Sequence, residues 1–552
     1  MPNGAQALMK TLVDAGIEVC FSNPGTSEMH FVAALDNEPK MRAVLALFEG
    51  VATGAADGYA RMAGKPAATL LHLGCGLGNG LANLHNARKG KSPMINIVGD
   101  HATYHVKYDA QLQSDIETVA RNVSPNFVRT SQRTEELCKD AAEAITAARG
   151  LPGQVATLIL PADVSWGEGG QACTVPEQKP APCADSSTIE SISEAINSDK
   201  KTALLLGGQA LREAGLLAAG KIAAAKGVTL FAETFPSRIE RGAGLPAVER
   251  IAYLAEMASL QLSEFDHLIL VDAKAPVSFF AYPGKQSYLV PDSCTVHTLS
   301  SEEQDAIASL TQLAESLGAD STQAILQSPG RPGRPKGKLS AEKVCRAVGE
   351  LMPENSIIVD ESITSGLMLN AMTAGAPRHD MITLTGGAIG QGLPSAIGAA
   401  IACPDRPVLA LIGDGTAMYT NQALWTMARE NLNVTAIIFN NASYSVLNVE
   451  LERVGAEEAG EKAKSQLDIS RPVTNFALLA QSMGVHGTRV QTSEELLKAM
   501  EYSLSQPGPH LIEAVVPESL NGVKRKILPY LLKSMPNLPA PLSKALKNKI
   551  AP

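Results

Sequence analysis

The chain has 552 residues and a formal net charge of −9, with 45% hydrophobic, 19% charged and only 4% aromatic residues. The acidic balance argues against nucleic acid as a main partner. The chain has no uninterrupted apolar stretch of about 18 residues, so no membrane span is predicted. The eight cysteines include no Cys-x-x-Cys pair, so they indicate scattered reduced thiols rather than a zinc site or a disulfide framework.

Residues 1–170 alternate helical and strand-like patterns and predict a first α/β domain. The opening stretch has an amphipathic helix pattern without the basic and apolar regions of a signal peptide, so we expect a cytoplasmic protein. Runs such as AVLALFE, ATLLHLG and MINIVGD have strand length and alternate with helical runs such as GVATGAADGYARMAG. This alternation is typical of a doubly wound parallel sheet.

The same alternation recurs in two further segments, which are separated by proline-rich linkers. Residues 187–327 contain the strand-like runs TALLLGG and HLILVDA and predict a central α/β domain. Residues 339–516 predict a third α/β domain. Residues 517–552 carry scattered prolines and basic residues; we expect a solvated extension there, with a flap over the active site as the alternative.

The third segment contains the most informative motif, which runs from Gly413-Asp414-Gly415 to a pair of asparagines ending at Asn441. RPVLALI precedes the first group, the helical pattern TNQALWTMAREN lies between the groups, and VTAIIF precedes the second. Such a unit gives two parallel strands, so Asp414 and Asn441 should lie beyond their carboxyl ends, where parallel sheets bind ligands. A carboxylate, an amide oxygen and the Ser443 carbonyl suit Mg²⁺, completed by phosphate oxygens and water. The glycines and the start of the next helix would let the backbone approach a diphosphate.

Asp-Gly is also a common turn signal, so a loop that carries an acid by chance is the alternative. A sequence pattern that occurs twice in the chain bears on this choice. The stretch GLGNGLANLHNARKGKSPMINIVGD ends at Asp100, and GQGLPSAIGAAIACPDRPVLALIGD, of equal length, ends at Asp414. We therefore expect two domains of one topology, and only the second should hold metal and diphosphate, because His101 follows Asp100 whereas Gly415 follows Asp414.

These motifs resemble those of the acetolactate synthase-like family of thiamine diphosphate (ThDP) enzymes, which includes benzoylformate decarboxylase. The resemblance covers nearly the whole chain and rests on SNPGTSE, LFEG, DGYAR, LHLGCGLGN, DES, GGAIGQGLPSAIG, GDG and NNAS. It implies a pyrimidine-binding domain at 1–170, a central domain at 187–327, and a domain at 339–516 that binds diphosphate and Mg²⁺. It also implies a homodimer or homotetramer in which each site combines the first domain of one chain with the third of another.

The resemblance assigns a role to several residues. Glu49 matches the acid that protonates the pyrimidine ring of ThDP and so starts catalysis, whereas by itself it would be a first-turn carboxylate stabilised by the helix dipole. Gly387 matches the residue whose carbonyl accepts a hydrogen bond from the pyrimidine amino group. Ile389 matches the apolar residue that bends the cofactor; the alternative for Ile389 is core packing. The implied cofactor contacts of the third domain are Gly387, Ile389, Gly413, Asp414, Gly415, Thr416, Asn441, Ser443 and Tyr444, and the implied metal ligands are Asp414, Asn441 and Ser443.

The substrate side of the site departs from the family. His72 matches an active-site histidine of benzoylformate decarboxylase that acts as acid or base, although most lone histidines at strand ends serve packing. Thr26 stands in place of a substrate-binding serine, and Gln111 makes the facing loop polar. The second active-site histidine of benzoylformate decarboxylase falls in PVSFFAYPG, which has none. Glu450 replaces a tryptophan or phenylalanine of the family.

These departures leave the substrate open and favour a small or polar 2-oxo acid or related carbonyl compound. A carboxylate at Glu450 would repel a second acid, unless it turns toward Arg453 three residues further on. The first hypothesis is decarboxylation of a 2-oxo acid with possible carboligation to a second carbonyl. The second is simple decarboxylation or C–C cleavage, and the third is a ThDP-binding relative without turnover. No stretch of the central segment indicates the FAD that acetolactate synthases often carry.

Overall fold

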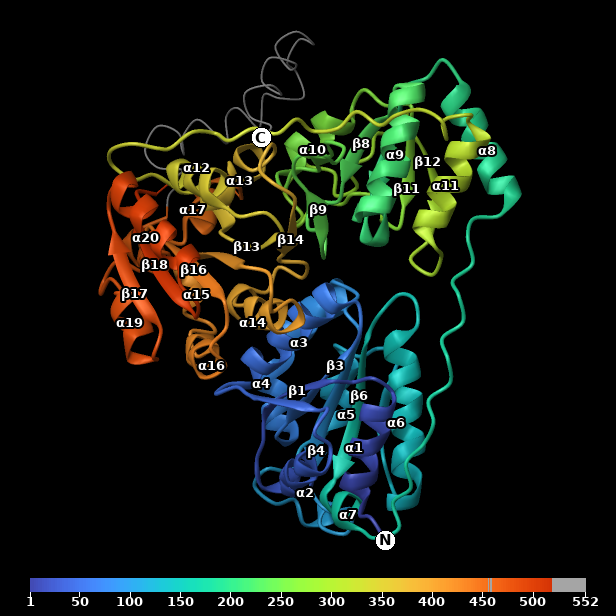
Figure 1. The fold of residues 1–552 in the computed structure, drawn as a ribbon, viewed down its shortest axis with the longest axis vertical. Coiled ribbons are helices and arrows are strands. Elements are labelled where there is room, and N and C mark those ends of the chain that lie inside the picture. Colours follow the sequence, from blue (N-terminus) through green and yellow to red (C-terminus); the bar gives the residue numbers. More distant parts are fainter. Residues whose placement is uncertain (455, 457–458, 519–552) are drawn as a thin grey trace.

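The computed structural model describes residues 1–454, 456 and 459–518. They form three α/β units, each built on its own sheet, with the amino-terminal unit at the bottom of Figure 1 and the other two above it. Long extended segments join the units, one before α8 (Ser186–Asn197) and one before α12 (Ala341–Leu351). Most of the basic tail predicted at 517–552 lies outside the described residues.

The first unit has a parallel sheet in the strand order β2-β1-β3-β4-β6-β5. Its strands are β1 (Val19–Asn23), β2 (Arg42–Leu45), β3 (Ala67–Leu71), β4 (Met94–Asp100), β5 (Val128–Thr130) and β6 (Val155–Pro161). Its helices are α1 (Gly4–Asp14), α2 (Met29–Ala34), α3 (Glu49–Ala63), α4 (Leu73–Lys89), α5 (Ile116–Arg121), α6 (Thr134–Arg149) and α7 (Ala162–Trp166), with short 3₁₀ turns η1 (Thr26–Glu28), η2 (Leu35–Asn37) and η3 (Val106–Tyr108).

The central unit has a parallel sheet in the order β10-β8-β7-β11-β12. Its strands are β7 (Thr202–Leu206), β8 (Thr229–Ala232), β10 (Glu249–Arg250), β11 (His267–Val271) and β12 (Thr295–Ser300). Its helices, besides α8, are η4 (Gly208–Leu211), α9 (Glu213–Lys226), α10 (Ala255–Leu262) and α11 (Ala306–Ser316).

The third unit has the order β17-β18-β16-β15-β13-β14-β9. Its strands are β13 (Ser356–Glu361), β14 (His379–Thr383), β15 (Val408–Gly413), β16 (Val434–Asn440), β17 (His486–Val490) and β18 (His510–Val515), which are parallel, and β9 (Ile239–Arg241). Its helices, besides α12, are η5 (Ile363–Gly366), α13 (Leu369–Met372), α14 (Gly392–Ala402), α15 (Asp414–Ala417), α16 (Ala423–Arg429), α17 (Ser445–Arg453), α18 (Glu461–Ser465), α19 (Phe476–Ser482) and α20 (Ser493–Ser505).

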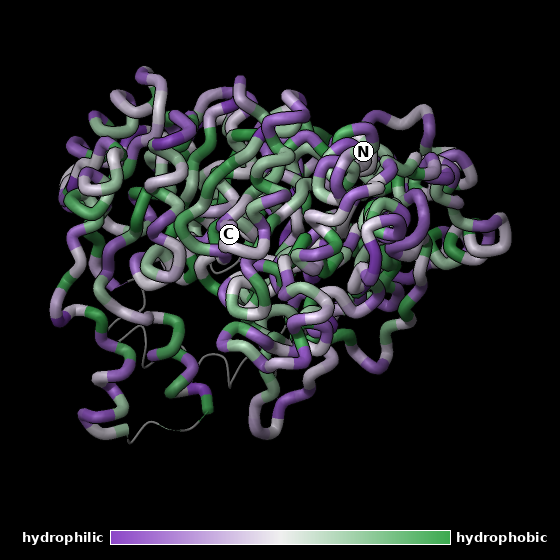
Figure 2. Tube along the Cα trace, turned by 90° about the horizontal axis from the view of Figure 1, so that it is seen from below, coloured by the Kyte–Doolittle hydropathy of each residue, from purple (hydrophilic) through white to green (hydrophobic). Residues whose placement is uncertain are grey.

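The predicted fold class, three α/β domains with parallel sheets, is confirmed. Their inner strands are apolar and buried, as expected where helices cover both faces of a sheet. Figure 2 shows hydrophilic stretches predominating on the outer turns of the trace. One strand, β9, departs from the parallel arrangement. It belongs to the central segment by sequence but pairs antiparallel with β14 of the third sheet. No helix of the described residues has the length and apolarity needed to cross a membrane.

The helix expected from TNQALWTMAREN begins later than its pattern suggests. The structure has a short helix α15 at the Asp414 turn and then α16, which starts at Ala423. Thr420 does not cap a helix there, because its hydroxyl donates to the Gly390 carbonyl at 2.9 Å. The Thr420 side chain thus makes a tertiary contact instead of a local capping bond.

Helices α3 and α14 join the first and third units by direct backbone contact (Figure 1). A Cβ atom built on Gly398 would lie 1.9 Å from the Ala55 carbonyl oxygen, and one on Gly58 would lie 2.2 Å from the Ser395 carbonyl oxygen. Any larger residue would therefore force the helices apart. This close approach places the start of α3, which carries Glu49, beside the loop that precedes α14.

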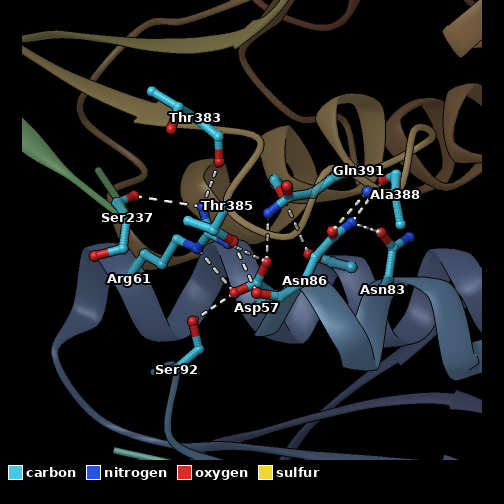
Figure 3. Close-up of polar contacts among 12 residues, drawn as sticks. Asp57, Arg61, Asn83, Asn86, Ser92, Ser237, Thr383, Thr385, Ala388 and Gln391 are labelled. Carbon is cyan, nitrogen blue, oxygen red and sulfur yellow. Dashed lines mark hydrogen bonds and ion pairs between the residues drawn. The ribbon is translucent and has the colours of Figure 1, made fainter. Parts of the chain in front are cut away.

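A buried guanidinium ties all three units together near this helix pair (Figure 3). Arg61 on α3 pairs with Asp57 at 2.7 Å and donates to the Thr383 carbonyl and the Thr385 hydroxyl, both at 2.7 Å. It also donates to the Ser237 carbonyl of the central unit at 3.4 Å. Since every partner is buried or half-buried, loss of this one side chain would leave several polar groups without hydrogen bonds.

We predict that Arg61→Met lowers the stability of the whole chain. Removing one partner of a buried ion pair costs about 3–5 kcal/mol, because the other charge stays buried without compensation. The thermal and urea midpoints of unfolding, followed by circular dichroism, should both fall.

Arg121→Met is a matched control for this prediction. Arg121 also pairs with an acid four residues earlier, Glu117 at 3.1 Å, but both side chains are exposed. Exposed pairs contribute little, so its midpoints should stay at the wild-type values. Equal midpoints for the two variants would contradict the structural role given to Arg61.

Candidate active site

Asp414 and Asn441 lie together at the carboxyl ends of the neighbouring parallel strands β15 and β16. Asp414 Oδ2 accepts the backbone N–H groups of Asn441 at 3.0 Å and Ala442 at 2.6 Å. Its other oxygen accepts the Gly415 N–H at 2.8 Å. The strand–helix–strand motif therefore brings together the two side chains that the sequence paired.

The Asp414 carboxylate is buried and has no ion pair with a lysine or arginine in the part of the chain that the structure describes. Burial raises its pKa, and the three backbone N–H groups oppose this shift only in part. Asn441 Oδ1 accepts the Ser443 N–H at 3.0 Å, which keeps the amide oxygen beside the carboxylate. A buried anion with a neighbouring amide and main-chain carbonyl suits a divalent cation with a preference for oxygen, such as Mg²⁺.

Gly415 leaves room for the ring of Tyr444, which follows the second strand. A Cβ atom on Gly415 would lie 2.4 Å from that ring. Burial, then Tyr419 and the Asp414 carboxylate, raises the pKa of Tyr444. Thr416 completes the turn by donating its hydroxyl to the Gly413 carbonyl at 2.8 Å. These residues lie around the turn that carries Asp414.

The loop from Gly386 to Gly392 is held by a residue for which the sequence alone indicated no role, Glu361. Its fully buried carboxylate, at the end of β13, accepts three successive backbone N–H groups, from Gly390 at 2.7 Å, Gln391 at 3.1 Å and Gly392 at 2.8 Å. Burial raises the pKa of Glu361 to about 7, against the effect of those hydrogen bonds. The sequence signal that could have indicated Glu361 is its place in the DES motif, directly after an apolar run of strand length.

This loop presents the two residues expected to contact the cofactor's rings. Gly387 has φ +73°, a left-handed conformation that favours glycine, and Phe279 of the central unit packs 2.4 Å from where its Cβ would be. Ile389 is half-buried rather than enclosed in the core. The position of Ile389 is therefore compatible with contact to a bound ligand.

Glu49 starts α3 and lies beside the same loop. Its carboxylate is buried, accepts the Asn79 amide at 3.0 Å, and forms no ion pair within the described ranges. Asn83 links the two segments, because its amide reaches both the Gly50 carbonyl at 2.7 Å and the Gly390 carbonyl at 3.2 Å. Glu49 is thus a buried carboxylate with hydrogen-bonding capacity to spare.

His72 caps α4 at the end of β3, and its ring packs on the glycine before Thr26. A Cβ atom on Gly25 would lie 2.2 Å from His72 Nδ1. The same nitrogen lies 2.8 Å from Glu28 Oε2. Thr26 is exposed at the start of η1, so the structure brings Thr26 and His72 to one edge of the first sheet. Gln111 is exposed on the loop between η3 and α5.

Glu450 pairs with Arg453, which is the alternative considered in the sequence analysis. Its carboxylate accepts from Arg453 at 3.0 Å and from the Tyr282 hydroxyl at 2.7 Å. Arg453 also pairs with Glu256 at 2.9 Å and lies 3.9 Å above the centre of the Tyr282 ring. This network removes the premise that an unpaired Glu450 carboxylate repels a second acid. Tyr282, which the sequence reasoning missed, lies in the segment where no histidine was found.

The candidate residues form two groups at the edges of two sheets. Asp414, Asn441 and Tyr444 make one group, and Glu49 and His72 belong to the other. No hydrogen bond or ion pair between described residues joins Asp414 or Asn441 to Glu49 or His72. Within one chain the groups are connected through Asn83 and the loop before α14.

Comparison with known proteins places each of these two groups within a matched domain. Residues 2–121 match the model of the thiamine pyrophosphate enzyme N-terminal TPP-binding domain, and residues 364–514 match the C-terminal one. A Mycobacterium tuberculosis protein named "Putative acetolactate synthase large subunit IlvX" is 55% identical over 93% of this chain and 99% of its own length. Benzoylformate decarboxylase of Pseudomonas aeruginosa is 26% identical over 90% of this chain and 96% of its own.

A solved structure has the same fold. The ThDP-dependent 4-hydroxybenzoylformate decarboxylase of Rhodococcus jostii superposes with a TM-score of 0.82 at 23% identity, over 94% of this chain and all of that one. The two matched domains coincide with the two groups of candidate residues. The chain therefore belongs to the acetolactate synthase-like family of thiamine diphosphate enzymes.

Proposed function

We propose that the protein is a ThDP- and Mg²⁺-dependent enzyme that decarboxylates a small 2-oxo acid and can pass the product to a second carbonyl compound. The observation that carries this proposal is Glu49, a buried carboxylate at a helix start that has no cationic partner among the described residues. A carboxylate in this state can bind a ring nitrogen and hold a proton there. An intact Glu49 also counts against a relative that binds the cofactor without turnover.

The third unit supplies the groups that would hold the cofactor. Asp414, Asn441 and the Ser443 carbonyl would bind Mg²⁺, and the backbone and side chains of Gly413, Gly415, Thr416 and Tyr444 would surround the diphosphate. When bound, ThDP supplies a nucleophilic carbon and accepts the electron pair released with CO₂. Glu49 would hold a proton on the pyrimidine ring, Gly387 would accept from its amino group, and Ile389 would support its bent shape.

His72 and Thr26 would act on the substrate. The imidazole is part-exposed at the sheet edge, and an imidazole can serve as a general acid or base. The Thr26 hydroxyl can donate to a carboxylate or carbonyl oxygen. These two residues favour the second candidate function, simple decarboxylation of the benzoylformate decarboxylase type, in which the bound intermediate is protonated instead of ligated.

The cluster of Tyr282, Glu450 and Arg453 would favour a substrate that carries hydroxyl groups. The Tyr282 hydroxyl donates to the Glu450 carboxylate, and Arg453 pairs with both Glu450 and Glu256. This cluster would therefore offer hydrogen-bonding groups rather than an isolated charge. Gln111 would add a further polar contact from its exposed loop.

We propose that the active enzyme is at least a homodimer. The two groups of residues contact each other only indirectly within one chain, which supports a site completed by the first unit of a second chain. A cytoplasmic location stays a prediction.

We further propose that the central unit holds no flavin. Parallel sheets bind nucleotides at the loop after the first strand, here Gly207-Gly208 after β7. Asp272 fills this place: its Oδ2 accepts the Gln209 N–H at 2.9 Å and lies 1.9 Å from where a Gly208 Cβ would be. Burial raises the pKa of the adjacent Glu233 to about 7. Two acids at this loop disfavour a phosphate.

A product screen tests the function. The purified chain, supplied with ThDP and Mg²⁺, should release CO₂ from at least one member of a panel of pyruvate and hydroxylated 2-oxo acids. Mass spectrometry should then find a ligated hydroxy ketone or, for the second candidate, a free aldehyde. The proposal fails if no acid of the panel loses CO₂ while ThDP is bound.

We predict that Asp414→Asn weakens Mg²⁺-dependent ThDP binding by about 10–100-fold, because interactions with a charged group contribute about 1.5–3 kcal/mol. Isothermal calorimetry in the presence of Mg²⁺ measures the affinity. Asp100→Asn is the matched control, since Asp100 ends β4 in the equivalent position of the first unit and accepts the His101 N–H at 2.7 Å. An equal loss in both variants would refute the metal assignment.

We predict that Glu49→Gln binds ThDP with near-normal affinity and loses turnover by about 10²–10⁴-fold, the usual contribution of a positioned acid or base. Steady-state kinetics on the acid found in the screen provides the measurement.

Glu135→Gln controls for the removal of a helix-start carboxylate, because Glu135 is an exposed acid in the first turn of α6. Its turnover should be unchanged. Near-normal turnover of the Glu49 variant would show that Glu49 only stabilises the start of α3.

A further inference from the structure

We propose that Glu28 is a positioning residue for His72: its carboxylate holds the imidazole with Nδ1 protonated and so leaves Nε2 free to exchange a proton with the substrate. Because this role rests on the proposed function of His72, it deepens that function by stating which nitrogen acts. Glu28 itself does not touch the substrate in this scheme.

The geometry places the carboxylate behind the imidazole. Glu28 Oε2 accepts the Gly25 N–H at 2.7 Å and lies 2.8 Å from His72 Nδ1. The Glu28 side chain has no exposed surface, whereas that of His72 is 23% exposed. An ionised carboxylate can only accept hydrogen bonds, so Nδ1 must carry the proton and Nε2 must be the accepting nitrogen.

Backbone contacts fix both side chains in this arrangement. The Gly25 backbone lies against one side of the His72 ring, as a Cβ there would be 2.2 Å from Nδ1. Glu28 Oε1 packs against Gly99 at the end of β4, where a Cβ would lie 1.7 Å away. These close contacts hold the acid against the imidazole in the folded chain.

A capping role alone does not explain a buried carboxylate at this position. Glu28 does cap the start of η1 through the Gly25 N–H, but a neutral glutamine could accept the same hydrogen bond. Glu28 Oε1 has no hydrogen-bond partner among the described residues, and burial raises the pKa of Glu28 against the opposing effects of Gly25 and His72. Burying a charge costs several kcal/mol unless it is paired, and His72 provides the pairing.

The other titratable groups near this pair are engaged elsewhere or do not act on Glu28. Asp163 of α7 accepts from Thr103 at 2.9 Å, and Asp100 of β4 accepts the His101 N–H at 2.7 Å. The His30 ring stacks near Trp166 at 5.9 Å. Further groups on the packed elements are Glu49, Cys75 and His101. Among these titratable groups, His72 is the one that lowers the pKa of Glu28 against the effect of burial.

Nitrogen-15 NMR tests the pairing without reference to turnover. The full chain, labelled with ¹⁵N-histidine and supplied with ThDP and Mg²⁺, should show His72 as the Nδ1–H tautomer above its titration range. Its signals are identified by their loss in His72→Asn. In Glu28→Gln they should shift toward a mixture of tautomers, while those of His85, which contacts the Gly386 carbonyl, stay in place. A wild-type His72 with its proton on Nε2 overturns the proposal.

Kinetics provides the second measurement. Glu28→Gln should lower kcat by about 10–100-fold, as loss of a partner behind a functional histidine does, with KM and ThDP affinity little changed. The acid limb of the kcat/KM profile should move to lower pH, because the imidazolium loses its carboxylate. The exposed Glu117→Gln should match the wild type. A Glu28→Gln profile that superimposes on the wild-type profile contradicts the proposal.

A double variant separates positioning from a structural effect. If Glu28 acts only through His72, Glu28→Gln should cause no further loss in a His72→Asn background, whereas independent effects would add. Absence of turnover on every 2-oxo acid would remove the proposed function but leave the tautomer measurement valid. If Glu28→Gln fails to fold, the tautomer of His72 in the wild type still decides whether Glu28 holds the proton on Nδ1.

Discussion

The backbone-to-backbone contact of α3 with α14 is the constraint on which the rest of the structure depends. Gly58 and Gly398 leave no room for a side chain, so the two helices can approach at one spacing only. Since α3 begins at Glu49 and α14 follows the 386–392 loop, this spacing sets how far Glu49 lies from that loop within one chain. Arg61 locks the same contact through hydrogen bonds to all three units.

Buried acids at strand ends recur around the site, and each is stabilised differently. Glu361 accepts three backbone N–H groups and orders a loop. Glu28 pairs with an imidazole. Asp414 accepts backbone N–H groups and has no cationic side chain beside it in the described part of the chain, which leaves its charge available to a cation. The ends of parallel strands thus offer one kind of position, and the neighbours of each acid decide how its charge is compensated.

The central unit contacts the residues proposed for the site, although it lies between the two matched domains. Its strand β9 extends the third sheet, and its segment around Phe279 and Tyr282 packs on Gly387 and Glu450. Through these contacts the central unit fixes the surroundings of Gly387 and Glu450.

Local sequence determined the parallel sheets, the meeting of Asp414 with Asn441, and the placing of Glu49 at a helix start. Strand and helix periods and the turn glycines are properties of short stretches, and a strand–helix–strand unit brings its two strand ends together. The tertiary structure alone decided that Glu450 pairs with Tyr282, 168 residues away, and that Glu28 lies behind His72. Such partners are selected by packing between segments distant in the chain, and no local pattern carries that information.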